Sequence, residues 1–167
     1  MSGFRAVDDA WLALQNAAES QRRAEAVVYL GEQRYAPAVP YLISLLQEAD
    51  PGTRYLCARA LGQIGDEAEA AVPALLEALR GDDMFLRAGV TGALIHIGYP
   101  AVPGLTAALF DDSNAVKRAA CKALGKIGNP RATAALTNAL QDANAGVRRL
   151  AAEALERIEN HGHHESE

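Results

Sequence analysis

The stretch RYLCARALGQIG, residues 54–65, returns with variations along the chain and decides its fold. Aligned on the basic residue and on the leucine near their end, the other copies fall at residues 87–94, 117–124 and 148–155, with a degraded copy at 23–30. Their basic residues are separated by 31, 33, 30 and 31 positions. A fixed period of about 30 residues is typical of a solenoid of stacked helical units. The sequence therefore predicts such a stack and no globular core around a catalytic pocket.

Each unit is predicted to contain two helices. The first is short, carries a leucine stripe and often opens near a proline, as at Pro40, Pro73 and Pro103. Proline lacks a backbone N–H, and it is tolerated there because N–H groups in the first turn of a helix have no partner within the helix. A turn rich in Asp, Asn, Gly and Ser follows and is expected to cap the second helix, which carries the repeated stretch. Glycines at the ends of the second helices are predicted to be left-handed C-caps: Gly65, Gly98 and Gly128.

This organisation predicts an all-α protein of ten antiparallel helices in five pairs. Residues 1–159 are expected to form a single repeat domain, and residues 160–167 a disordered tail. The second helices of the first and last pairs carry polar residues where the inner ones have Ile-Gly, which is expected of capping units at both ends of a stack.

Composition and charge narrow the function classes. The 167 residues are 50% hydrophobic and only 5% aromatic, as in close-packed helices, and the net charge of −5 argues against a general nucleic-acid binder. No apolar run approaches the roughly 20 residues of a membrane span, and no secretory signal is visible. Cys57 and Cys121 fall on small-residue positions of the repeat, which predicts free buried thiols. A cytoplasmic protein fits these features.

Two copies of the repeat carry a family resemblance. VKRAACKALGKIG, residues 116–128, and VRRLAAEAL, residues 147–155, resemble the pattern V-R-x-x-A-A-x-A-L-G-x-I-G of HEAT repeats, in the short subtype associated with phycobilin lyases (PBS-lyase HEAT-like repeats). The resemblance implies an α-solenoid with a right-handed superhelix, whose second helices line the concave face. The basic residue of each copy is expected to bond to an aspartate turn between adjacent units.

Positions of the repeated stretch that the core does not constrain are the candidates for binding. Gly89 and Gly92 remove side chains from the middle second helix, so a notch is expected there, although tight helix packing explains the glycines equally well. The notch is predicted to be flanked by Tyr55, Leu56, Arg59 and His96. A basic group on the last two second helices is predicted to orient a partner with an acidic surface, with a solvated helix face as the alternative. The group consists of Arg118, Lys122, Lys126, Arg149 and Arg157.

No catalytic constellation, metal site or cofactor motif stands out in the sequence. The main prediction is therefore a protein-interaction scaffold or adaptor, monomeric, that binds a protein partner on the concave face and binds neither nucleic acid nor membrane. The alternative, which the resemblance implies, is a phycobilin lyase, a lyase subunit or a chaperone-like assembly factor for a cofactor-bearing antenna protein. An enzymatic role is left open and, if present, is expected to be of the bilin lyase type.

Overall fold

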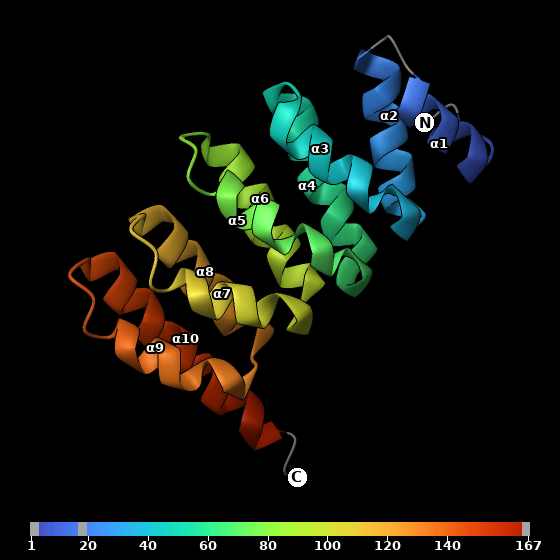
Figure 1. Cartoon of the computed structure of the whole chain (residues 1–167). Coiled ribbons are helices and arrows are strands. Elements are labelled where there is room, and N and C mark those ends of the chain that lie inside the picture. The colour runs from blue at the N-terminus through green and yellow to red at the C-terminus, as the bar shows by residue number, and fades with distance from the viewer. Residues whose placement is uncertain (1–3, 17–19, 165–167) are drawn as a thin grey trace.

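A computed structural model describes residues 4–16 and 20–164, and all regular structure in this part of the chain is helical (Figure 1). Short 3-10 helices precede four of the pairs' first helices: Ala36–Ala38 (η1), Gly65–Ala71 (η2), Tyr99–Ala101 (η3) and Pro130–Ala132 (η4). The α-helices are Val7–Asn16 (α1), Ser20–Glu32 (α2), Val39–Glu48 (α3), Pro51–Ile64 (α4), Val72–Ala78 (α5), Met84–Ile97 (α6), Val102–Ala108 (α7), Asn114–Ile127 (α8), Thr133–Ala139 (α9) and Ala145–His164 (α10).

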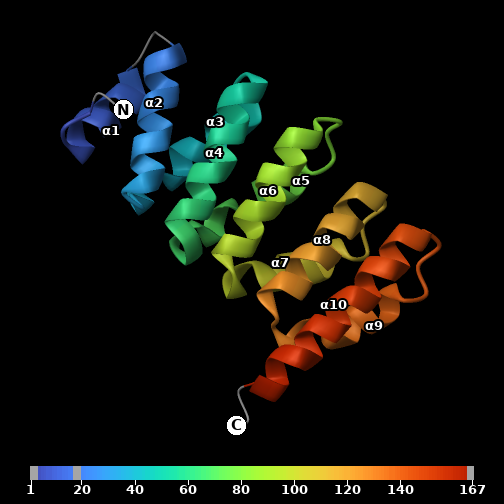
Figure 2. The ribbon, with the colours of Figure 1, turned by 180° about the vertical axis from the view of Figure 1, so that it is seen from behind.

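The helices stack in chain order as five antiparallel pairs, and the predicted α-solenoid is confirmed. The first helices α3, α5, α7 and α9 form the layer nearer the viewer in Figure 1, and the second helices α4, α6, α8 and α10 form the layer nearer the viewer in Figure 2. The two termini lie at opposite ends of the stack. Helix α10 continues to His164, into the segment 160–167 that was predicted to be disordered, and residues 165–167 lie outside the described residues.

The first helices α3, α5, α7 and α9 are each entered through a 3-10 turn that the sequence pattern did not predict. The last residue of this turn is an alanine with no exposed surface, so a larger side chain would push the turn away from the core. A proline follows at the first or second helical position of α3, α5 and α7, as predicted. The buried alanines are Ala38, Ala71, Ala101 and Ala132.

Side chains of the turns cap the second helices as predicted. Asp50 accepts a hydrogen bond from the Thr53 N–H at 3.0 Å, and Asp83 accepts one from the Leu86 N–H at 3.0 Å. At the other ends Gly65, Gly98 and Gly128 all have positive φ angles, between 74° and 84°. Only Gly128, with ψ of 16°, is a left-handed cap; the ψ angles of Gly65 and Gly98, −139° and −132°, are suited to glycine alone.

One fully buried leucine from each of the eight helices α2 to α9 anchors a continuous core between the layers. Complete burial of a leucine side chain contributes about 1.5–3 kcal/mol, so the repeated leucines supply much of the stability. Leucines with no exposed surface recur in the first helices as Leu42, Leu75, Leu105 and Leu136, and in the second helices as Leu30, Leu61, Leu94 and Leu124.

Glycines that follow these leucines let neighbouring second helices touch. A β-carbon added to any of three of them would stand 2.7–2.9 Å from the Cα of an alanine on the next second helix, which is closer than real contacts allow. The backbones therefore pack against each other without intervening side chains. The contacts join Gly31 to Ala60, Gly62 to Ala93 and Gly125 to Ala154.

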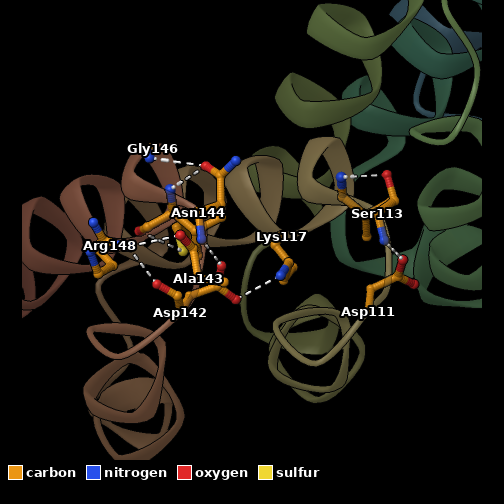
Figure 3. Close-up of polar contacts among 11 residues, drawn as sticks. Asp111, Ser113, Lys117, Asp142, Ala143, Asn144, Gly146 and Arg148 are labelled. Atoms are coloured by element: carbon orange, nitrogen blue, oxygen red, sulfur yellow. Dashed lines mark hydrogen bonds and ion pairs between the residues drawn. The ribbon is translucent and has the colours of Figure 1, made fainter.

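The basic residues of the repeat mostly bond within their own pair, so the prediction of bonds between adjacent units is wrong for them. Arg54 Nε donates to the carbonyl of Leu46 at 2.8 Å, and Arg87 and Arg148 donate to carbonyls of their own turns. The guanidinium of Arg54 thus satisfies a carbonyl in the last turn of α3, and those of Arg87 and Arg148 satisfy carbonyls of the turns before their own helices. Of the four basic residues, Lys117 alone bonds to the next pair, as predicted: its Nζ lies 2.6 Å from a carboxylate oxygen of Asp142 (Figure 3). The hydrogen bond from this ammonium group lowers the pKa of the Asp142 carboxyl below its usual range.

Both cysteines are free and buried, as predicted. Burial raises the pKa of the Cys57 thiol to about 12 and that of Cys121 to about 11. Because the thiolate is the reactive form, we expect Ellman's reagent at pH 8 to react negligibly with the native protein and to release two thiols in urea. Rapid reaction of either thiol in the native protein would show that its helix interface opens readily.

Candidate functional site

The face formed by the second helices carries a hollow of about 940 Å³ between α2, α4 and α6. We call it the central hollow. It collects the predicted Tyr55 and Arg59 from α4 and the predicted Gly89, Gly92 and His96 from α6. The helical repeat brings them together because residues three or four positions apart share one face of a helix, and α4 and α6 are neighbours in the stack.

The two glycines of the predicted notch have different roles. A β-carbon on Gly89 would stand 2.9 Å from two ring carbons of Tyr55, so this glycine makes room for a side chain of the same protein. A β-carbon on Gly92 would have no neighbour within 4 Å. The notch is therefore filled by Tyr55 at Gly89 and open at Gly92.

Alanine substitutions should separate these roles. Gly92→Ala is expected to raise the free energy of unfolding by about 1 kcal/mol, because it removes the helix penalty of glycine and meets open space. Gly89→Ala adds the same methyl group against the ring of Tyr55 and should give no such gain. Thermal unfolding should show a rise of about 2–4 °C for Gly92→Ala only. Equal rises for both would mean that Tyr55 does not pack on Gly89.

Three charged or aromatic residues that line the central hollow were not among the site residues predicted from the sequence. Arg34 lines the hollow in a left-handed conformation, with φ of 51°, at the position where Gly65 ends the next second helix. The sequence did contain a signal for Arg34, because an arginine stands where the second helices α4, α6 and α8 end in glycine. A left-handed backbone conformation costs energy in a residue other than glycine, and such conformations cluster at functional sites. Phe85, whose residue surface is 76% exposed, and Asp66 also line the hollow, but no periodicity marks them.

The formal charges of the central hollow balance at pH 7, with two arginines and two acidic residues. Arg34, Arg59 and His96 face two acidic residues, Glu32 and Asp66. Among the described residues, no ion pair involves Arg34 or Arg59. The hollow thus offers two guanidiniums and two aromatic rings to a ligand, a combination that suits a flat molecule carrying carboxylates.

A second depression of about 680 Å³ lies between α6 and α8 and reaches α10. We call it the basic groove. It collects four of the five predicted basic residues, and it shares Ala88 and Gly92 with the central hollow, so the two are continuous across α6. The four residues are Arg118, Lys122, Lys126 and Arg149.

Two predicted site residues lie outside both depressions. Leu56 is half-buried and packs against the hydrophobic core, so it supports the fold. Arg157 is exposed and lies beside Lys122 and Lys126 at a small recess of about 90 Å³ between α8 and α10.

Within the described residues, no three His, Cys, Asp or Glu side chains come together in a way that could hold a metal ion. The histidines of the tail that follow His161 lie outside this statement, because their side chains are not described. In the same part of the chain, no helix has the length and apolar character needed to cross a membrane.

Comparison with known proteins identifies the repeat. A model of HEAT repeats matches residues 9–94 and 72–156. The phycocyanobilin lyase subunit beta of Thermosynechococcus vestitus is 35% identical over 117 residues, which are 69% of this chain and 54% of that protein. The phycocyanin alpha phycocyanobilin lyase CpcF of Synechocystis sp. is 36% identical over 115 residues, 68% of this chain and 52% of that protein. The chain therefore spans about half the length of these relatives.

A solved structure agrees with these relatives. The complex of CpcE and CpcF of phycocyanin lyase from Nostoc sp. PCC7120 aligns with a TM-score of 0.63 and 26% identity, covering 94% of this chain and 66% of that chain. The main prediction of a scaffold or adaptor is wrong, because the matching relatives are lyase proteins and favour the alternative. The repeats, the helical stack and these relatives together show that the chain belongs to the HEAT-repeat family, with the short repeats of the lyase-like subtype.

Proposed function

We propose that this chain is a subunit of a phycobilin lyase and holds a linear tetrapyrrole in the central hollow. The observation that carries the proposal is the combination of Tyr55 and Phe85 with Arg34 and Arg59 around the open position at Gly92. The similarity to phycocyanobilin lyase subunits, over about half of their length, supports it.

The chemistry of a bilin suits these residues. The pigment is a conjugated, planar-ringed molecule with two propionate groups, so it needs aromatic faces for the rings and cations for the carboxylates. Guanidinium groups bind carboxylates through paired hydrogen bonds, and aromatic rings stack on flat ligands. The volume of about 940 Å³ lies within the range of about 300–1,000 Å³ that is usual for ligand sites.

A protein partner completes the proposal. The solved relative is a complex of two proteins, CpcE and CpcF of phycocyanin lyase, so this chain is proposed to work beside another protein. An acidic surface on that partner would complement Arg118, Lys122 and Lys126 in the basic groove. The cytoplasmic location and the monomeric state of the chain stay predictions.

Titration with phycocyanobilin tests the pigment site. A bilin held in one geometry by a chiral pocket should acquire circular dichroism in the visible range and a shifted absorbance band, saturating at one pigment per chain. Phycocyanobilin dimethyl ester, whose two carboxylates are blocked as esters, should bind at least about tenfold more weakly, a difference of about 1.4 kcal/mol. The absence of any induced signal at saturating pigment would refute the proposal.

A further inference from the structure

Among the second helices that have a following neighbour in the stack, α6 alone breaks the glycine pattern, and the basic groove lies beside it. Each leucine of the repeat is followed by glycine in α2, α4 and α8, but Leu94 of α6 is followed by Ile95. The glycines permit backbone contact with an alanine of the next helix, and no β-carbon fits there. Ile95 lines the groove, and α6 and α8 contact each other less extensively than any other neighbouring second helices. Ile95 therefore acts as a wedge between them.

The shape of the basic groove matches a short helix. Its α6 wall runs from Met84 to Ile95, which is about 16 Å at 1.5 Å per residue, and its α8 wall runs alongside from Ala115 to Lys126. A depression bounded by two side-by-side helices accepts a third helix, since helices pack through ridges and grooves. This length corresponds to about three turns of a bound helix.

The lining of the basic groove differs from that of the central hollow. Its apolar part is aliphatic, with Ile95, Ala119, Leu150 and the exposed Met84, and it contains no aromatic ring for a pigment to stack on. Methionine and aliphatic side chains favour the leucine-type face of an amphipathic helix.

The charges of the basic groove gather on one wall. Arg118, Lys122 and Lys126 stand four residues apart on α8, and among the described residues none of them forms an ion pair. Arg149 joins them from α10, where it pairs with Glu153 at 2.6 Å. The α6 wall contributes only Arg87, whose guanidinium donates to the carbonyl of Gly81. A bound segment would thus meet most of the positive charge along the flank formed by α8 and α10.

We propose that the basic groove receives an amphipathic helix of the protein partner, of about three turns, with an apolar face toward Ile95 and acidic residues along the flank next to α8. Like charges in a row repel one another, and acidic residues of a bound helix would relieve that repulsion. The inference rests on the proposed function only for the existence of a protein partner, because a helix can bind in the basic groove whether or not pigment occupies the central hollow.

A peptide assay without pigment tests the inference. The probe is a fluorescein-labelled, helix-stapled peptide of roughly 15 residues, with leucines at i, i+3, i+4 and i+7 and glutamates on one flank. Fluorescence anisotropy should show saturable binding that weakens with added salt. The same peptide with lysines in place of the glutamates should bind at least about tenfold more weakly.

Variants of the protein assign the binding to the groove. Lys122→Glu and Lys126→Glu should each lower the affinity about tenfold, whereas Arg131→Glu, an equal charge change at an exposed residue outside the groove, should not. Ile95→Gly should also weaken binding of the peptide, because a smaller side chain at this position lets α6 and α8 come closer and narrows the groove. If glycine impairs folding, Ile95→Ala takes its place.

Three results would overturn the inference: no binding, equal binding of both peptides, or equal affinity of the groove and Arg131 variants. If the lysine reversals abolish pigment binding and leave the peptide unaffected, the groove belongs to the pigment and not to a helix. Pigment binding at the central hollow and peptide binding at the groove can fail separately, so the two proposals are judged independently.

Discussion

Replacing Arg59 by glutamate is expected to remove most of the pigment affinity of the central hollow. Arg59 lines the hollow, is exposed, and has no ion-pair partner among the described residues, so its guanidinium is available to a propionate. A hydrogen bond to a charged group contributes about 1.5–3 kcal/mol. The Kd for phycocyanobilin should therefore rise by about 10- to 100-fold, and repulsion by the new carboxylate should add to this.

Two control variants make this result specific. Arg59→Lys keeps the charge and loses the paired geometry, so its Kd should fall between those of the wild type and of Arg59→Glu. Arg131→Glu changes the net charge equally at a distant exposed site and should bind pigment as the wild type does. If all three variants bind equally, the central hollow does not hold the carboxylates. Thermal unfolding of each variant checks that the fold is intact.

Replacing Gly125 by isoleucine should cause a large loss of stability. A β-carbon at this position would stand 2.7 Å from the Cα of Ala154, so the side chain can fit only if α8 and α10 separate. Overpacking of this kind costs about 1–3 kcal/mol, and the separation also exposes apolar surface. We expect a fall of about 5–10 °C in Tm. The variant would introduce between α8 and α10 the wedge that Ile95 supplies between α6 and α8.

The matched control is Gly92→Ile, which makes the same exchange in open space on α6. It should leave Tm within about 2 °C of the wild type, because isoleucine is a slightly better helix residue than glycine and meets nothing. It should also narrow the passage between the central hollow and the basic groove, since both are lined by Gly92. Similar losses of Tm in the two variants would mean that the glycine contacts between second helices do not control their spacing.

The helix starts and the buried leucines could be predicted from the sequence because they depend on local patterns. Capping side chains such as Asp50 and Asp83 bond to N–H groups two or three residues away, so short-range chemistry places the helix starts. The buried Leu61 and Leu94 recur at the period of the repeat, which places them at equivalent points of a stack. The resemblance to HEAT repeats likewise implied that Tyr55, Arg59 and His96 share one surface, and the central hollow collects all three.

The roles of individual site residues depended on neighbours about 30 positions away. Gly89 and Gly92 look alike in the sequence, but only Gly89 lies under the ring of Tyr55. Arg34 enters the central hollow because a positive φ turns the chain at the end of α2. The sequence placed the lyase function second, as the alternative implied by the resemblance, because the repeat pattern records how helices pack and not what they bind.

The sequence by itself determined the period, the helix pairs, their caps and the buried leucines, since these depend on contacts within a helix or between equivalent positions of the repeat. Only the tertiary structure decided where the surface is hollow. That outcome depends on how closely the second helices pack. Their backbones touch where Gly62 meets Ala93, whereas α6 and α8, beside the groove that Ile95 lines, contact each other less extensively. The physical reason is that a single β-carbon at a helix crossing changes the spacing of two whole helices, and every side chain between them changes its surroundings.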